Sequence, residues 1–152
     1  MNTTFTSCTE RPARADIDPM LTAYYEELQP RLADIGYPPL DIPVWIEDFW
    51  SHADEYLPPD GRTWIARDEA GRAVGWGTLR RARPDAGEMK RLFVLPEARG
   101  RGIARLLVQA RIDDAREMGW RHLLADTIRT NIEMQKLYLS FGFRFIDPYP
   151  ES

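Results

Sequence analysis

Hydrophobic residues recur with helical spacing in two early segments of the chain, and each segment carries signals for its start and its end. In residues 16–36 an acidic residue, Asp16 or Asp18, is placed to cap the helix, and Gly36 is placed to end it. In residues 41–57 Asp41 is the expected cap, and the prolines and glycine that follow stop the helix. The pattern therefore predicts two amphipathic helices near the N-terminus.

Shorter runs of strand-forming residues predict the first part of a sheet. Residues 3–9 and 63–66 are predicted strands. The polar stretch 68–71 is typical of a hairpin turn into a further strand, residues 73–79. The arginine-rich stretch 80–87 is expected to form a basic turn before the next strand.

A strand and a helix are predicted next. The apolar run 92–95 ends at Pro96, which cannot donate a hydrogen bond to a strand ladder. From there the hydrophobic residues soon take helical spacing, and Gly119 is suited to end that helix. The stripe that this spacing assigns to the buried face is Ile103, Leu106, Leu107 and Ala110.

The remaining chain predicts one more strand and one more helix. Residues 121–127 are a predicted strand, and residues 130–133 have the sequence of a capping box, so a helix is expected from there to Gly142. Residues 143–146 have the composition to begin a further strand. Because no repeat or linker divides the chain, residues 1–152 are expected to form a single domain.

The loop between the apolar strand and the following helix has the features of an anion-binding site. Gly100 and Gly102 allow backbone N–H groups to approach a ligand, and Arg99, Arg101 and Arg105 supply positive charge. A helix that begins directly after such a loop adds its unpaired N–H groups and the positive end of its dipole. The pattern predicts a phosphate or pyrophosphate site, and a solvated turn is the alternative.

Composition and charge narrow the class of protein. With 43% hydrophobic and 29% charged residues, the chain resembles an ordinary globular protein rather than a disordered or fibrous one. The formal charge of −4 argues against general nucleic-acid binding. Cys8 is the only cysteine and cannot form an internal disulfide, which favours a reducing compartment. No segment has the length of a membrane span or the core of a signal peptide, so a cytoplasmic location is expected.

Two motifs, far apart in the chain, together resemble a known family. Residues 99–104 match the R/Q-x-x-G-x-G/A acyl-CoA loop of the GNAT N-acetyltransferase superfamily, with Ala104 at a position where the motif permits alanine. Residues 131–143 match its N-x-x-x-x-x-L-Y-x-x-x-G-F signature. The resemblance implies an α/β (α+β) fold with a mixed, mostly antiparallel central sheet flanked by helices. It covers roughly residues 16–147.

The resemblance also implies a donor, acetyl-CoA, and the residues that hold it. In this family the amides of the loop hold the pyrophosphate at the helix N-terminus, and backbone groups of the preceding strand pair with the pantetheine arm and polarise the acetyl carbonyl. A polar residue near that arm corresponds to Asn131. The implied cofactor-binding residues are Leu92, Phe93, Val94, Arg99, Gly100, Arg101, Gly102, Ile103, Ala104 and Asn131.

Two catalytic roles follow from the same resemblance. Glu88 stands where some branches of the family place a general base, and Tyr138 matches the tyrosine often assigned as the acid that protonates the leaving thiolate. The chemistry needs such groups, because an amine attacks a thioester only when it is neutral and a thiolate leaves more readily when a hydroxyl donates to it. The structural alternatives are a solvated edge charge for Glu88 and a core tyrosine for Tyr138.

The acceptor side is less clearly encoded. The resemblance implies a small-molecule or peptide amine, and the aromatic and acidic residues of the two early helices would suit a cationic one. Neither histidine belongs to a metal-ligand cluster, so no metal is expected. The family normally ends with a further strand, and here that strand is either missing, truncated or supplied by a partner chain, which leaves a homodimer open.

Two other functions compete with acetyl transfer. A strand, a G-x-G loop, a helix and then Asp126 loosely resemble a dinucleotide fold, which would indicate a nucleotide-dependent oxidoreductase. Arg105 at the third glycine position and the short chain after Asp126 oppose that interpretation. The other alternative is a non-catalytic acyl-CoA-binding or interaction module that keeps the loop and has lost turnover.

Overall fold

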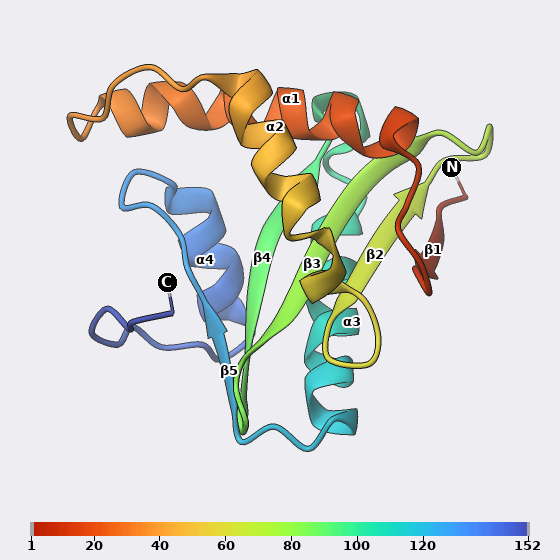
Figure 1. Cartoon of the computed structure of the whole chain (residues 1–152), viewed down its shortest axis with the longest axis vertical. Helices are drawn as coiled ribbons and strands as arrows, with labels where there is room; N and C mark the ends of the chain where they lie inside the picture. The colour runs from red at the N-terminus through yellow and green to blue at the C-terminus, as the bar shows by residue number, and fades with distance from the viewer. Residues whose placement is uncertain (1, 152) are drawn as a thin grey trace.

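The computed structural model describes residues 2–151, and in this part of the chain one five-stranded sheet is flanked by helices (Figure 1). The strands lie in the order of the sequence, and neighbouring strands are antiparallel except β4 and β5, which are parallel. The strands are β1 (Thr4–Ser7), β2 (Arg62–Arg67), β3 (Ala73–Arg83), β4 (Ala86–Val94) and β5 (His122–Ala125). The helices are α1 (Arg14–Ala33), α2 (Ile42–Ser51), α3 (Ile103–Glu117) and α4 (Ile132–Ser140), with 3-10 turns η1 (Ala53–Tyr56) and η2 (Pro96–Ala98).

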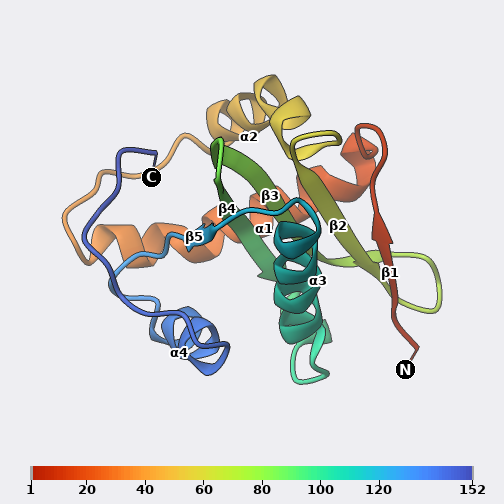
Figure 2. The same ribbon diagram turned by 90° about the horizontal axis from the view of Figure 1, so that it is seen from below.

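The helices form two layers with the sheet between them. Helices α1 and α2 cover one face, and α3 packs against β2, β3 and β4 on the other (Figures 1 and 2). The central strand β3 is buried on both faces over residues 73–79, and Trp76 in this part is fully buried against Phe49 of α2. Burial of large side chains on both faces is what holds the layers together.

The two N-terminal helices form as predicted, with one difference in capping. Asp41 caps α2, accepting a hydrogen bond from the Val44 amide. Helix α1 begins at Arg14, earlier than expected, so neither Asp16 nor Asp18 caps it. The Asp18 carboxylate instead accepts a hydrogen bond of 2.6 Å from the indole of Trp50 and so connects α1 to α2.

The basic turn predicted for residues 80–87 is wrong. Arg80, Arg81 and Arg83 all belong to β3, and the turn is confined to residues 84 and 85. The arginine side chains are accommodated at this end of the strand because each forms an ion pair with a carboxylate. Arg80 pairs with Glu88 across the hairpin, while Arg81 contacts Asp60 and Arg83 contacts Glu151. Strand β4 therefore starts before Glu88, which lies inside the strand rather than at its exposed start.

The buried face of α3 also differs from the predicted stripe. Ile103 and Leu107 are buried as expected, but Leu106 is 52% exposed. Val108 and the fully buried Arg111 take the remaining inward positions. The buried stripe thus follows every fourth residue from Ile103 to Ala115, rather than the predicted i, i+3, i+4, i+7 pattern.

Of the two elements predicted after β5, the helix forms and the strand does not. Helix α4 forms, but its cap is Asn131, whose side chain accepts from the Met134 amide, and not Thr130. The strand predicted at residues 143–146 is absent, since residues 143–151 contain no helix or strand. Within residues 2–151 the sheet thus ends at β5.

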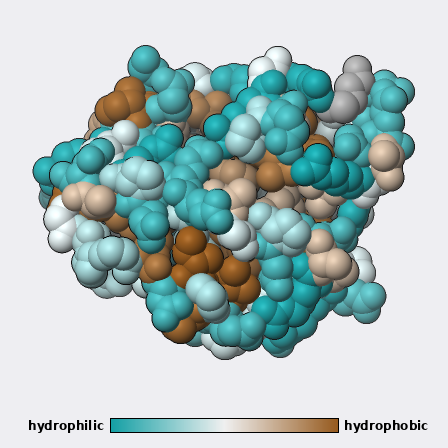
Figure 3. Space-filling model, turned by 90° about the horizontal axis from the view of Figure 1, so that it is seen from above, coloured by the Kyte–Doolittle hydropathy of each residue, from teal (hydrophilic) through white to brown (hydrophobic). Residues whose placement is uncertain are grey.

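The surface seen from above is mainly hydrophilic, with a hydrophobic patch near the lower edge of that view and further hydrophobic residues at its upper left (Figure 3). Phe145 and Ile146, beyond α4, are among the large hydrophobic side chains that the fold leaves exposed. Among residues 2–151, no helix combines the length and the hydropathy needed to cross a membrane.

Candidate functional site

Strand β4 loses its neighbour halfway along. Its first half, from Ala86 to Met89, pairs with β5, but β5 then ends and the chain turns toward α4. Residues 90–94 continue with only β3 beside them. In Figure 1 the two strands meet at one end and separate toward the other. Backbone groups along this edge have no strand partner, which is unusual for a strand inside a sheet and suits an extended ligand.

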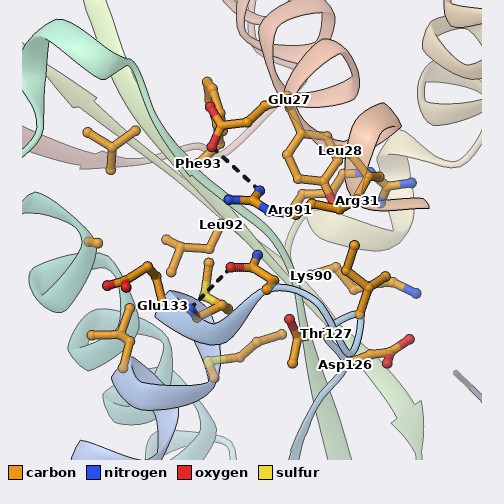
Figure 4. Close-up of a pocket in the computed structure, with 18 of the residues that line it drawn as sticks. Glu27, Leu28, Arg31, Lys90, Arg91, Leu92, Phe93, Asp126, Thr127 and Glu133 are labelled. Atoms are coloured by element: carbon orange, nitrogen blue, oxygen red, sulfur yellow. Dashed lines mark hydrogen bonds and ion pairs between the residues drawn. The ribbon is translucent and has the colours of Figure 1, made fainter. Parts of the chain in front are cut away.

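A cavity of about 610 Å³ lies beside this unpaired edge. Its walls come from α1, from residues 89–94 of β4, from the loop that follows β5 and from α4. Figure 4 shows Glu27 and Arg31 on the α1 side and Asp126 on the loop, with residues 90–93 of β4 between them. The cavity therefore passes from one face of the sheet to the other through the gap between β4 and β5. A second hollow, of about 920 Å³, lies between β5, α4 and residues 143–149.

A β-bulge distorts β4 where it borders the cavity. The pairing with β3 passes from Trp76 opposite Phe93 to Thr78 opposite Lys90, so Gly77 alone faces two residues, Arg91 and Leu92. Arg91 has φ 52°, in the left-handed region that non-glycine residues seldom occupy. A bulge turns amides out of the ladder and is common beside active sites. The amides at this bulge are consequently candidates to donate to a ligand carbonyl.

A buried arginine supports the bulge from the α3 side. Arg111 is fully buried, and its Nη1 donates to the carbonyl oxygens of Thr78 and Lys90 at 2.9 and 3.2 Å. Gly77 leaves room for it, because an added Cβ there would lie 3.1 Å from the guanidinium carbon. Sequence reasoning missed this residue. The signal was a charged side chain four residues after the buried Leu107, at a core position of the helix.

The predicted strand–loop–helix is present at the other end of the cavity. Gly100 and Gly102 have φ 81° and 78°, and a Cβ added to either would meet no atom within 4 Å, so both lie against open space. Gly102 occupies the N-cap position of α3. The first amides of α3 and the positive end of its dipole therefore face the opening beside the loop.

Two of the three arginines near this loop turn toward the protein. Arg99 lies across the unpaired edge of β4, donating from Nε to the Val94 carbonyl at 2.9 Å and pairing with Glu27 at 2.7 Å. Arg105 donates to Ser140 of α4 and its guanidinium lies 4.6 Å from the Phe141 ring centre. In this structure the side chains of Arg99 and Arg105 thus connect elements of the fold, and the supply of charge to an anion by the three arginines stays a prediction.

Glu88 is buried, so its interpretation as a solvated edge charge is wrong. Its carboxylate has no exposed surface and is held by Arg80 at 2.8 Å and by the Tyr149 hydroxyl at 2.7 Å. Lys90 Nζ lies 3.7 Å from the same carboxylate. Burial and the hydrogen bond to Glu88 raise the pKa of Tyr149. Glu88 is not among the side chains that line the cavity, whereas Lys90 is.

Tyr138 lies on the wall of the cavity, where α4 faces the gap between the strands. It is 7% exposed, and its ring packs against Phe143 with ring centres 5.4 Å apart. Burial raises the pKa of its hydroxyl, and the nearby Arg111 guanidinium offsets part of that rise. The phenol therefore keeps its proton at neutral pH, as a proton donor must.

Six of the predicted donor-binding residues line this cavity, whereas Gly100, Arg101, Gly102 and Ile103 do not; the six are Leu92, Phe93, Val94, Arg99, Ala104 and Asn131. Asn131 caps α4, and the same residue lines the cavity wall. The strand residues Leu92, Phe93 and Val94 line it from β4. The structure thus brings the β4 edge, the α4 cap and Tyr138 to one cavity, with the glycine loop at its mouth and Glu88 behind its wall.

Comparison with known proteins decides the family. The sequence pattern described as the acetyltransferase (GNAT) family matches residues 21–143, which is most of the chain. This chain belongs to the GNAT acetyltransferase family. It is accordingly an acyltransferase of the N-acetyltransferase class, and the family resemblance of its two motifs is confirmed.

Individual relatives agree with this assignment. An uncharacterized N-acetyltransferase of Schizosaccharomyces pombe is 33% identical over 135 residues, which cover 88% of this chain and 80% of the relative. A predicted acetyltransferase from Clostridium acetobutylicum, solved with acetyl-CoA, has a TM-score of 0.66 at 16% identity, with 97% and 94% of the two chains covered. AAC(6')-Iy, solved with a CoA-containing bisubstrate analogue, has a TM-score of 0.65 at 21% identity, with 98% and 95% covered. The two solved structures show the shared GNAT fold.

Proposed function

We propose that this GNAT enzyme transfers the acetyl group of acetyl-CoA to a primary amine by direct attack in a ternary complex. The observation that carries the proposal is the unpaired, bulged edge of β4 beside the N-terminus of α3. An extended thioester arm needs hydrogen-bonding partners along its length, and a pyrophosphate needs amides at one end. These two features lie at the same cavity in this fold.

The donor lies along the unpaired edge of β4, with its pyrophosphate at the N-terminus of α3. The amides of residues 99–104 bind the pyrophosphate, and the backbone of Leu92 and Val94 pairs with the pantetheine arm. Asn131 contributes its amide group near that arm. Because Arg99 now occupies the Val94 carbonyl, its side chain must move as the donor binds. The acetyl-CoA complex of the C. acetobutylicum protein, which shares the fold, supports this choice of donor.

The reaction forms one bond and breaks another. The amine nitrogen attacks the thioester carbonyl carbon, the oxygen becomes an oxyanion that accepts from amides of the β4 bulge, and the carbon–sulfur bond then breaks. As the carbonyl re-forms, Tyr138 donates its proton to the departing thiolate and so yields the free thiol of CoA, and the phenolate then regains a proton from solvent. The products are the acetylated amine and CoA, and the proton lost by the amine leaves separately.

Glu88 is the proposed acceptor of the amine proton. Its carboxylate accepts hydrogen bonds from Arg80 and from the Tyr149 hydroxyl, which hold it in place. Since the carboxylate lies behind the cavity wall rather than in it, an intervening water molecule must carry the proton past Lys90. Arg111 has a supporting role, because its hydrogen bonds hold the carbonyl of Lys90 and with it the shape of the bulge.

Calorimetric titration with acetyl-CoA tests the donor site. Gly102→Trp should weaken binding at least about tenfold, because the new side chain occupies the opening in which the pyrophosphate lies. Gly119→Trp is the matched control, since Gly119 has φ 74° and equally open surroundings but lies at the far end of α3. Equal binding by both variants would contradict the site. Binding of NADH instead of acetyl-CoA would contradict the proposed donor, and acetyl-CoA binding without turnover of any amine would indicate a non-catalytic acyl-CoA-binding protein.

A further inference from the structure

The side chain of Arg91 lies on the opposite face of the bulge from Arg111, under α1 and α2. Its guanidinium carbon lies 5.1 Å from the ring centre of Phe49 and 5.4 Å from that of Tyr56. Its Nη1 donates to the Tyr56 hydroxyl at 2.7 Å. Arg91 also lines the cavity, on the side away from α3. Because the proposed donor lies at the N-terminus of α3, this opposite side is the one left for an acceptor.

The partners of Arg91 are neutral, which sets it apart from the other cations of the cavity. Arg31 and Arg99 both pair with Glu27, and Lys90 lies 3.7 Å from Glu88. Within residues 2–151 no carboxylate lies within 4.0 Å of Arg91. A partly buried guanidinium that contacts only phenols and aromatic faces keeps a charge that is not neutralised, so it can still form an ion pair with a bound anion.

The acidic side chains that line the cavity do not pair with Arg91. Glu27 of α1 is taken by two arginines, and Glu133 lies in the first turn of α4 at the donor side. Asp126, from the loop after β5, lines the same cavity; burial raises the pKa of both Tyr24 and Tyr138, and the charge of Asp126 adds to the rise. Arg91 is therefore the positive group at the bulge, and Asp126 lies on the loop across the cavity from it.

We propose that the acceptor is a primary amine that carries a carboxylate, and that Arg91 binds this carboxylate. The inference rests on the proposed function and names its substrate class. It reverses the expectation of a purely cationic amine, because a polyamine would place positive charge against Arg91. The guanidinium forms a bidentate pair with the carboxylate and anchors the amine beside the same bulge whose amides polarise the acetyl group.

Matched acceptors test the proposal. Release of CoA is measured with amines that differ only in the acid group: glycine and glycinamide, β-alanine and its amide, and 4-aminobutyrate and its amide. This series also varies the distance between amine and carboxylate. For at least one pair the acid should have a kcat/KM at least about tenfold above that of the amide. Arg91→Gln should reduce that ratio to about 1, mainly through a higher KM for the acid, and Arg91→Lys should restore part of it.

Arg31→Gln is the matched control for charge. It removes a cation from the same cavity, but one that is already paired with Glu27, so the acid-to-amide ratio should stay as in the unmodified enzyme. All variants retain a non-glycine residue at position 91, so the backbone strain at φ 52° is unchanged and folding can be checked by the melting temperature.

Three outcomes separate this inference from the function on which it rests. Equal use of acids and amides, a preference for polyamines such as spermidine, or an unchanged ratio in Arg91→Gln would each overturn the carboxylate inference while leaving acetyl transfer standing. If no amine is acetylated, the proposal of acetyl transfer fails. Calorimetry of N-acetylglycine in the presence of CoA then still tests whether Arg91 binds a carboxylate. Binding that Arg91→Gln weakens at least about tenfold supports the carboxylate site, and no binding by the unmodified protein refutes it.

Discussion

Replacing Tyr138 by phenylalanine separates the proposed proton donor from its structural role. The ring, which is 7% exposed and packs on Phe143, stays in place, and only the hydroxyl is lost. Loss of its polar interaction beside Arg111 should cost about 1 kcal/mol of the free energy of unfolding. For a chain of this size that corresponds to a melting temperature lower by about 2–4 °C.

The kinetic effect should be much larger than the effect on stability. General acid catalysis typically contributes about 10²–10⁴ in rate, so kcat of Tyr138→Phe should fall at least about 100-fold, which is roughly 2.7 kcal/mol in the barrier. The assay follows the free thiol of CoA with a chromogenic disulfide under saturating acetyl-CoA. Calorimetry should give an acetyl-CoA Kd within about twofold of the unmodified enzyme.

A control variant removes a hydroxyl that has no proposed role. Tyr37 is 57% exposed and lies outside the cavity, so Tyr37→Phe should leave kcat and Kd unchanged. If kcat of Tyr138→Phe stays within twofold of the unmodified enzyme, the reasoning is refuted and Tyr138 is a core residue only.

Three further predictions follow from contacts in the fold. Glu88→Gln breaks the buried pair with Arg80, so it should lower the free energy of unfolding in denaturant by about 3 kcal/mol and lower kcat at least about 100-fold. Arg80→Gln should destabilise the protein similarly but lower kcat less than tenfold. Equal losses of kcat in the two variants would indicate that Glu88 has a structural role only. Burial raises the pKa of Tyr24 to about 12 and also raises the pKa of Tyr138 and Tyr149 above the ordinary value of 10.0, so above pH 10 the unfolded chain loses protons that the folded chain keeps. The contribution of these phenols to the free energy of unfolding is therefore fully present below pH 10 and is lost as the pH rises beyond it. The melting temperature should fall over this range, less steeply in Tyr149→Phe, and a melting temperature that is constant up to about pH 11.5 would show these phenols to be accessible. Gly87→Ala places a Cβ in collision with the Trp120 ring and should lower the free energy of unfolding in urea by about 2 kcal/mol or more, and a loss below about 0.5 kcal/mol would mean that the ring moves freely.

The parts of the fold that local sequence signals control were predictable. Gly36, Gly119 and Gly142 follow their helices with positive φ, and Asp41 caps α2, because these effects depend on a few adjacent residues. The strand–loop–helix that opens at Gly102 belongs to the same class, since its glycines and its apolar flanks are consecutive in the chain.

The parts that depend on distant partners were not predictable from local patterns. Arg80, Arg81 and Arg83 belong to a stretch with the composition of a turn, and only the carboxylates that pair with them make a strand possible. Glu88 is held by Tyr149, which lies 61 residues away in the sequence. The bulge that turns Arg91 toward α2 requires Gly77 on the neighbouring strand and Arg111 on α3. Such contacts decide the chemistry of the site but leave little trace in any single segment.

Acetyl transfer itself is tested most directly by incubating the enzyme with acetyl-CoA and the acid and amide amines named above, and measuring CoA release and acetylated product together. The account predicts equal molar amounts of free CoA and N-acetylated amine, detected by mass spectrometry, and loss of both in Tyr138→Phe. Absence of acetylated product with every amine, or CoA release without any acetylated amine, would contradict it.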